Sequence, residues 1–295
     1  MTKILNTIGN TPLVQLQHIG DGKIYVKVEK TNPAGSIKDR PAYTMIQGAI
    51  EDGLLKPGME IVEPTSGNMG IALALIGRNL GYKVNLVMPK SMSIERRKLM
   101  EAYGANLILT GEGGMKTALD KAKEMAEDPN YYMPGQFDNP RNVEAHVKHT
   151  GPEILQALPD IKGFVAGIGT GGTVTGVGQV LKEKDSSIQV WGLEPEESAL
   201  LSQGQAGPHK IQGIGANFVP SILDQDLMDQ VITVKGEEAI QMARDLAEKE
   251  GLFVGISAGA NVVGALHLLE KVGGPVATVL PDTGERYLST ELVKD

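Results

Sequence analysis

Short apolar segments alternate with longer amphipathic ones along most of this 295-residue chain. Residues 23–29 alternate apolar and polar side chains, as a half-buried strand does. Further strands are predicted from short apolar runs at 60–63, 83–88, 106–109, 163–168, 188–193 and 276–280. Helices are predicted between them at 68–80, 93–103, 115–127, 173–182 and 237–250, and another begins at Ser257. This alternation indicates an α/β fold with open, mostly parallel sheets flanked by helices.

Two irregular, polar stretches interrupt the alternation. Residues 128–142 are the strongest candidate for a domain boundary, and the chain is long enough for one large or two ordinary domains. Residues 203–229 form a stretch that is too long for a simple connection. We therefore expect a functional loop there.

Composition narrows the classes of function. The formal net charge is −8 and the basic residues are scattered, which argues against nucleic acid as a partner. The absence of cysteine excludes disulfides, thiolate catalysis, iron–sulfur clusters and cysteine-bound zinc. No apolar run approaches the ~18 residues of a membrane helix, and the first residues are too polar for a signal peptide, so a cytoplasmic location is expected. Glycine is in excess, with 37 residues, which predicts turns that hold ligands closely.

Lys38 stands at the mouth of a predicted helix, directly after a loop broken by proline and glycine. Ser36 is expected to cap this helix, and Pro41 falls in its first turn, where a missing N–H is tolerated. The helix dipole and any neighbouring cation should lower the pKa of the Lys38 amine. A neutral amine can attack a carbonyl group, whereas a solvated first-turn lysine would only be a surface charge.

Three glycine-rich turns follow, each between a predicted strand and a predicted helix. The turn at 63–70 can hold a carboxylate or a phosphate on free backbone amides, or it can be an ordinary helix cap. The turn at 167–173 fits the dinucleotide pattern G-x-G-x-x-G, and Glu194 ends the next strand, where a ribose-binding acid belongs. The same turn suits a single phosphate equally well, so the pattern leaves both ligands open.

The third turn, at 255–259, has the form G-x-S-x-G. In an α/β-hydrolase Ser257 would be the nucleophile, with an acid and then a histidine later in the chain. Here only His267 follows, on the same predicted helix, and Asp282 comes after it. We therefore interpret Ser257 as a helix cap or as a ligand contact.

His146 and His149 lie three residues apart on a predicted helix and could share a metal ion. With no third ligand nearby and no H-E-x-x-H pattern, no metal site is predicted.

Seven motifs stand in a characteristic order along the chain. They are Gly-Asn-Thr-Pro-Leu at 9–13, Pro-Ala-Gly-Ser-Ile-Lys-Asp-Arg at 33–40, Pro-Thr-Ser-Gly-Asn at 64–68, Gly-Thr-Gly-Gly-Thr at 169–173, Lys-Ile-Gln-Gly-Ile-Gly at 210–215, Gly-Ile-Ser-Ala-Gly at 255–259 and Leu-Pro-Asp-Thr-Gly-Glu-Arg-Tyr at 280–287. In this order and spacing they closely resemble the cysteine synthases (O-acetylserine sulfhydrylases). These are fold-type II enzymes that depend on pyridoxal 5′-phosphate, and the resemblance covers nearly the whole chain.

The resemblance implies a fold and a domain division. Two open, twisted, mostly parallel sheets flanked by helices are expected, in the architecture of the tryptophan synthase β subunit. Residues 1–40 with 146–295 would form a larger, cofactor-binding domain. Residues 41–145 would form a smaller, mobile domain that closes over the substrate.

The resemblance also implies roles for individual residues. Lys38 matches the lysine that binds the cofactor aldehyde and moves the substrate proton. The cofactor would further be held by Asn68 at its ring hydroxyl, by Ser257 at its pyridine nitrogen and by a phosphate loop made of Gly169, Thr170, Gly171, Gly172 and Thr173. The substrate would be bound by Thr65, Ser66, Gly67, Met69, Gln136 and Gly213. A hydroxyl facing the pyridine nitrogen leaves that nitrogen largely neutral, which favours elimination at Cβ over transamination.

The implied reaction is β-replacement, in which O-acetyl-L-serine and sulfide give L-cysteine and acetate through an α-aminoacrylate intermediate. Alternatives are the related chemistry on cysteine or O-phosphoserine, with sulfide used or released, and a nicotinamide-dependent oxidoreductase built on the Gly167 turn. Met69 departs from the family pattern, where threonine is usual, which removes one possible hydrogen bond to the substrate carboxylate. The resemblance further implies a homodimer, and a serine acetyltransferase whose C-terminal peptide would dock in the cradle that Met69 alters.

Overall fold

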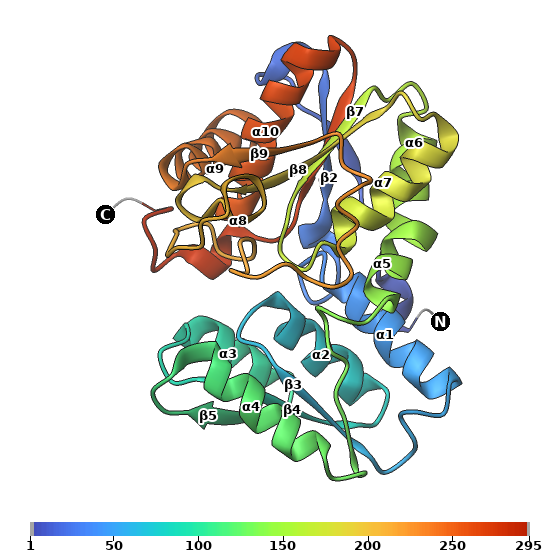
Figure 1. Cartoon of the computed structure of the whole chain (residues 1–295), viewed down its shortest axis with the longest axis vertical. Helices are drawn as coiled ribbons and strands as arrows, with labels where there is room; N and C mark the ends of the chain where they lie inside the picture. The colour runs from blue at the N-terminus through green and yellow to red at the C-terminus, as the bar shows by residue number, and fades with distance from the viewer. Residues whose placement is uncertain (1–2, 294–295) are drawn as a thin grey trace. The chain divides into compact units, whose positions relative to one another are not determined.

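A computed structural model of the chain describes residues 3–293 and divides the chain into two compact units (Figure 1). The smaller unit joins the N-terminal residues up to Ile8 with Lys38–Asn142. The larger unit joins Gly9–Ile37 with the chain from Val143 onward. The assignment of cofactor binding to one part and of closure over the substrate to the other stays a prediction.

The smaller unit contains a four-stranded sheet whose pairs are all parallel. Its strands are β3 (Glu60–Pro64), β4 (Lys83–Pro89), β5 (Asn106–Thr110) and β6 (Tyr131–Tyr132), in the order β5-β4-β3-β6. Its helices are α1 (Asp39–Glu51), α2 (Asn68–Asn79), α3 (Ile94–Ala102) and α4 (Gly114–Ala126). Helix α4 buries Ala118 and Ala122 against Val62 of β3 and Val87 of β4.

The larger unit contains a six-stranded sheet in the order β1-β2-β10-β7-β8-β9. Its strands are β1 (Leu13–Gln15), β2 (Ile24–Val28), β7 (Gly163–Gly167), β8 (Gln189–Pro195), β9 (Gln230–Val234) and β10 (Val276–Leu280). Only the pair β1–β2 is antiparallel among these strands. Its helices are α6 (Gly151–Ala157), α7 (Gly172–Lys184), α8 (Leu200–Gln203), α9 (Gly236–Glu250) and α10 (Ile256–Val272), while α5 (Arg141–Ala145) spans the joint with the smaller unit.

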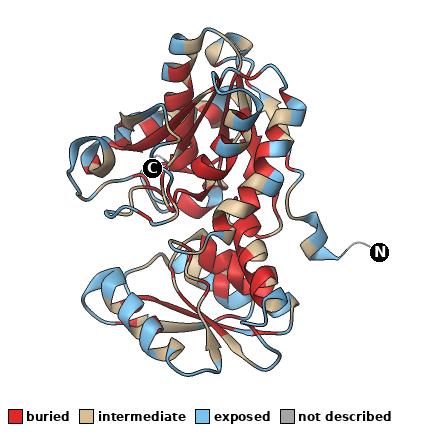
Figure 2. Ribbon diagram, turned by 45° about the vertical axis from the view of Figure 1, so that its right-hand side comes forward, coloured by how far each residue is buried: buried red, intermediate tan, exposed pale blue. Residues whose placement is uncertain are grey.

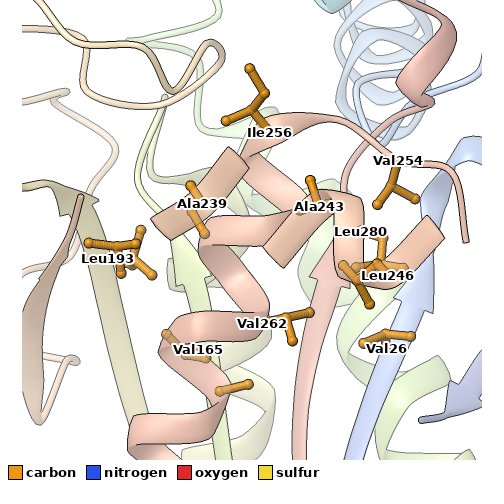
Figure 3. Close-up of a cluster of buried hydrophobic side chains, with 14 of the residues drawn as sticks. Val26, Val165, Leu193, Ala239, Ala243, Leu246, Val254, Ile256, Val262 and Leu280 are labelled. Carbon is orange, nitrogen blue, oxygen red and sulfur yellow. The ribbon is translucent and has the colours of Figure 1, made fainter. Parts of the chain in front are cut away.

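The four inner strands of this sheet, β2, β10, β7 and β8, are largely buried, because helices cover both of its faces (Figure 2). Val165 of β7 joins one core with residues of α9 and α10, which Figure 3 shows in close-up. Its neighbours Phe164 and Ala166 point to the opposite face and join a second core with Val174 and Val177 of α7. Successive strand residues point to opposite faces, so apolar side chains at consecutive positions require cover on both.

The strands and helices expected from the sequence agree with the structure, with ends that differ by a few residues. The sequence pattern missed β1, β6, β9, α6 and α8, which are short or lie on sheet edges. The stretch 203–229 contains no strand, and α8 is the only helix that reaches into it. Within residues 3–293, no helix combines the length and the apolar character that crossing a bilayer requires.

Candidate functional site

Two of the three glycine-rich turns lie at the same edge of the six-stranded sheet. Strands β7 and β10 are parallel neighbours, so their carboxyl ends meet at one edge. The 167–173 turn leaves this edge after β7. The 255–259 turn is tied to the end of β10, because Gly255 N–H donates to the Asp282 carbonyl at 3.4 Å and Val254 bridges to Thr283. Ligands of open parallel sheets commonly bind at such carboxyl edges.

Asn261, which the sequence analysis did not single out, binds the backbone of both strands at this edge. It lies on α10, one turn after Ser257, and is completely buried. Its side-chain oxygen accepts from Gly167 N–H, and its amide donates to the Val279 carbonyl, both at 2.8 Å. One side chain therefore links the start of the 167–173 turn to the end of β10.

The 167–173 turn is closely packed by its own unit. A Cβ on Gly169 would overlap the Gly213 carbonyl oxygen, so only glycine fits there. Gly171 has a φ of +83° and caps α7 without a side chain. Gly172 N–H donates to Thr170 Oγ1 at 3.4 Å, and the amides that follow it in the first turn can bind an anion. Gly215 N–H donates to the Ile168 carbonyl at 2.9 Å. Part of the 203–229 stretch, including Gly213, thus supports this turn.

His146 contacts the same turn and was considered in the sequence only as a metal ligand. It lies in the π-helical turn His146–Thr150 and is buried. Its Nδ1 lies 2.9 Å from Thr150 Oγ1, and its Nε2 lies 3.3 Å from Thr173 Oγ1. Both ring nitrogens therefore face threonine hydroxyls, which leaves neither for a metal ion shared with His149.

Glu194 does not have the position of a ribose-binding acid. It is buried at the end of β8, and its carboxylate accepts from the amides of Leu201 and Ser202 at 2.8 Å each. It also accepts from the Ser202 hydroxyl at 2.6 Å. The Glu194 carboxylate therefore binds residues of α8 instead of a ribose, and the argument for a dinucleotide at the 167–173 turn loses this acid.

Ser257 is buried in the first turn of α10, whose N-cap is Gly255, so Ser257 is not the helix cap. Its contact with a ligand stays a prediction. His267 lies ten residues later on the same helix, about 15 Å along its axis, which is too far for a catalytic pair. Close to this turn, Tyr287 O–H donates to Asp282 Oδ2 at 2.7 Å.

Lys38 follows a segment anchored to the end of β10. Ser36 bridges to Asp282, and Ile37 N–H donates to the Pro281 carbonyl at 2.8 Å. Helix α1 begins at Asp39, so Lys38 is its N-cap residue. The prediction that Ser36 caps this helix was wrong, because the β10 end takes Ser36 into its bridge. Burial, rather than a neighbouring cation, lowers the pKa of Lys38 to about 8.

In the smaller unit, the 63–70 turn joins β3 to α2. Gly67 caps α2 without a side chain, and its own N–H donates to Thr65 Oγ1 at 3.4 Å. A Cβ on Gly67 would meet nothing within 4 Å. Ser66 and Asn68 are half-buried beside it. The start of α2 therefore offers backbone amides and hydroxyls to a small anion.

Met69 and Gln136 were also predicted to bind the substrate at this turn. Met69 is only 2% exposed, so its side chain is packed rather than displayed at the surface. Gln136 N–H donates to Glu63 Oε1 at 3.1 Å, and its carbonyl accepts from Asn142 Nδ2 at 2.8 Å. Glu63 was missed in the sequence, where a charged residue inside a short apolar strand was the available signal.

The donor set suits a phosphorylated carbonyl cofactor. The larger unit offers an anion site at the start of α7 and the Ser257 hydroxyl, which can face a neutral ring nitrogen. Lys38 supplies an amine whose lowered pKa leaves a useful fraction neutral near physiological pH.

Comparison with known proteins agrees with this chemistry. Residues 4–282 match the family described as "Pyridoxal-phosphate dependent enzyme". Cysteine synthase B of Campylobacter jejuni is 51% identical, over 98% of each chain. A cysteine synthase of Staphylococcus aureus is 48% identical, over 98% of this chain and 96% of its own length.

Solved structures show the same fold under several names. O-ureido-L-serine synthase superposes with a TM-score of 0.95 at 46% identity, covering 99% of this chain and 95% of the other. Cysteine synthase of Entamoeba histolytica gives 0.94 at 43% identity, covering 100% and 92%. A hydrogen sulfide-producing enzyme of Fusobacterium nucleatum gives 0.94 at 43% identity, covering 98% and 90%.

The expected architecture, fold-type II with two mostly parallel sheets flanked by helices, is therefore confirmed. The chain is a member of the pyridoxal-phosphate-dependent enzymes and, within them, of the cysteine synthase family.

Proposed function

We propose that this enzyme makes L-cysteine and acetate from O-acetyl-L-serine and sulfide. The observation that carries the proposal is the amine of Lys38, with its pKa lowered to about 8, directly after a segment fixed to the edge that bears the 167–173 and 255–259 turns. The nicotinamide-dependent alternative loses its support, because the family is that of pyridoxal phosphate and Glu194 caps α8.

The larger unit would hold most of the cofactor. Amides at the start of α7 and the hydroxyls of Thr170 and Thr173 would bind the phosphate, and Ser257 would face the pyridine nitrogen. When bound, pyridoxal phosphate supplies an aldehyde that takes up an amino group and a ring that withdraws electrons from Cα. Asn68 would donate to the ring hydroxyl.

The protein's own groups would then move the proton and orient the amino acid. Lys38 would take the proton from Cα, which allows acetate to leave from Cβ, and would return it to Cα after sulfide has added to Cβ. Thr65, Ser66 and the amides at the start of α2 would bind the substrate carboxylate, with Gln136 beside them and Gly213 contributing from the 203–229 stretch. Each of these roles orients Cα toward the Lys38 amine.

A second candidate reaction follows from Met69. A buried, apolar side chain stands where the family pattern has a hydroxyl, and this difference would change the binding of the donor carboxylate. Related enzymes are named O-ureido-L-serine synthase and hydrogen sulfide-producing enzyme. Use of cysteine or O-phosphoserine as donor, or release of sulfide, is therefore the alternative.

Product analysis separates these reactions. The purified enzyme with added pyridoxal phosphate is incubated with O-acetylserine and sulfide, and cysteine and acetate are quantified. Equal amounts of both products, with much slower turnover of O-phosphoserine and cysteine, support the proposal. Faster sulfide release from cysteine would assign the alternative, and no turnover of any donor would overturn both.

We further propose that the enzyme is a homodimer, and that a serine acetyltransferase peptide binds weakly or not at all, because Met69 alters the cradle it would enter. Sedimentation of the purified protein tests the first statement. A titration with the acetyltransferase C-terminal peptide tests the second, and micromolar or tighter binding would contradict it.

A further inference from the structure

Glu63 is a buried carboxylate in the smaller unit that the proposed reaction does not use. It lies at the end of β3, two residues before Thr65, and its side chain is 1% exposed. Carboxylates are almost never this deeply buried without partners that stabilise their charge. The partners of Glu63 therefore indicate what the residue does.

Both carboxylate oxygens bind the backbone of the segment that carries Gln136. Oε2 accepts from Gly135 N–H at 2.9 Å, and Oε1 accepts from Gln136 N–H at 3.1 Å. Two consecutive amides thus converge on one side chain from a strand 72 residues earlier in the chain. Only an ionised carboxylate offers a full acceptor to each of them.

β6, just before this segment, pairs with β3, and Arg141, just after it, binds Asp52, while two asparagines hold the segment from within. Asn139 Nδ2 donates to the Pro134 carbonyl at 2.9 Å, and Asn142 Nδ2 donates to the Gln136 carbonyl at 2.8 Å. Both asparagines come from the same stretch of chain. Of these three side chains, Glu63 alone connects the segment to the strand that leads into the 65–69 turn.

We propose that Glu63 is a positioning residue for the amino-acid substrate, whose carboxylate fixes Gln136 relative to the 65–69 turn by binding the amides of residues 135 and 136. This inference rests on the proposed function, in which both segments bind the substrate carboxylate. Glu63 itself touches no substrate atom in this account.

The surroundings of Glu63 make this connection sensitive to pH. Asp138, from the loop after β6, is the charged group that acts on it, and Tyr132 of β6 is the nearby titratable group. Leu86, opposite Glu63 on β4, is apolar. Burial is the main cause that raises the pKa of Glu63 to about 7, against the two amide hydrogen bonds, which lower it. Below this pH the protonated group keeps one good acceptor and loses the other.

Replacing Glu63 with Gln gives a matched probe. The amide has the size and the single acceptor of the protonated acid, so E63Q keeps the neutral form at every pH. The control is Glu60→Gln, on the same strand, because Glu60 binds Lys83 and Asn85 instead of residues 135 and 136.

The first measurement is kinetic. We expect the KM of E63Q for O-acetylserine to equal that of the wild type near pH 6 and to exceed it about 5- to 10-fold near pH 8, with kcat changed less than about 2-fold. E60Q should match the wild type at both pH values. A KM ratio of one near pH 8, or a raised ratio that does not vary with pH, would overturn the inference, because a merely structural defect has no reason to follow this titration.

The second measurement needs no activity and uses hydrogen exchange of a peptide that covers residues 133–137, corrected for the intrinsic exchange rate. Local release of the two amides leaves Glu63 buried and without the hydrogen bonds that lower its pKa, so ionisation opposes this release. We therefore expect wild-type protection to rise about 3- to 10-fold between pH 6 and pH 8, and E63Q to stay at the pH 6 value. Equal wild-type protection at both pH values would sink the inference even if E63Q does not fold. If the enzyme turns over no donor, the proposed function fails, while the exchange data still decide whether Glu63 holds this segment.

Discussion

The 167–173 turn of the larger unit and the 63–70 turn of the smaller unit share one design and differ in how firmly they are held. Both connect a parallel strand to a helix capped by glycine. A Cβ added to Gly169 would overlap the Gly213 carbonyl oxygen, and one added to Gly171 would lie 2.8 Å from Leu223 Cβ. A Cβ added to Gly67 would have no atom within 4 Å.

This difference matches the lifetimes of the two proposed ligands. A cofactor that stays bound through many turnovers suits a rigid, closely packed turn. A substrate that enters and leaves in each cycle suits a turn with free space. The closely packed turn is held by backbone contacts, Asn261 and His146. The open one is joined to the Gln136 amide by the side chain of Glu63, beyond the pairing of β3 with β6.

Removing the Lys38 amine should separate cofactor binding from catalysis. We expect Lys38→Ala to lower the rate of cysteine formation by at least about 1,000-fold, since the group that moves the Cα proton is lost. Pyridoxal phosphate should still bind, because the larger unit's turn is intact. Steady-state rates and equilibrium dialysis measure the two effects. Lys56→Ala, at an exposed lysine, is the control, and an active Lys38→Ala enzyme would contradict the account.

Replacing glycine with alanine, which adds one methyl group, should have different consequences in the two turns. Gly169→Ala forces a Cβ into the Gly213 carbonyl, so we expect cofactor affinity to fall at least about 10-fold and folding to weaken by about 2–3 kcal/mol. Gly67→Ala meets no atom within 4 Å and should change folding by less than about 0.5 kcal/mol, with its effect confined to the KM of the amino acid.

Cofactor titration and urea unfolding of both variants measure these effects. Equal behaviour of the two variants would remove the contrast between the turns.

Global unfolding, which moves Glu63 into water, should become easier as the pH rises. The pKa of Glu63 is raised from 4.5 to about 7, so its contribution to folding is complete below about pH 4.5 and is lost as the pH rises through 7. Relative to E63Q, the wild type should lose about 2–3 kcal/mol of apparent unfolding free energy between pH 4.5 and pH 8.

Urea unfolding of both proteins across this range tests the prediction. Parallel curves would show that Glu63 titrates normally. The ionised carboxylate that binds both amides is thus also the form that weakens the fold.

Met69 gives the smallest expected effect. Met69→Thr adds a hydroxyl toward the substrate carboxylate and also removes buried volume. Met69→Val removes nearly the same volume without adding a hydroxyl, so it is the matched control. We expect Thr to lower the KM for O-acetylserine several-fold relative to Val, and equal KM values would show that this position does not reach the substrate.

The features that could be predicted from the sequence are those that depend on residues close together in the chain. The short apolar runs and helix starts predicted most strands and helices, and the glycine turns fell where strands end. The sequence analysis missed Asn261, His146 and Glu63 as parts of the site, because each acts on a segment far away in the sequence. Ser36 was misjudged for the same reason, since the end of β10 engages it. The partners of Glu194 are only seven and eight residues away, on a short helix that the pattern did not predict.

Cysteine synthesis with pyridoxal phosphate can be followed in the visible absorption spectrum of the purified enzyme, recorded with the cofactor before and after O-acetylserine is added. We expect a yellow protein whose band moves to longer wavelength with O-acetylserine and returns when sulfide is added. A protein that stays colourless with added pyridoxal phosphate, or a yellow one that does not respond to O-acetylserine, would contradict the proposed function.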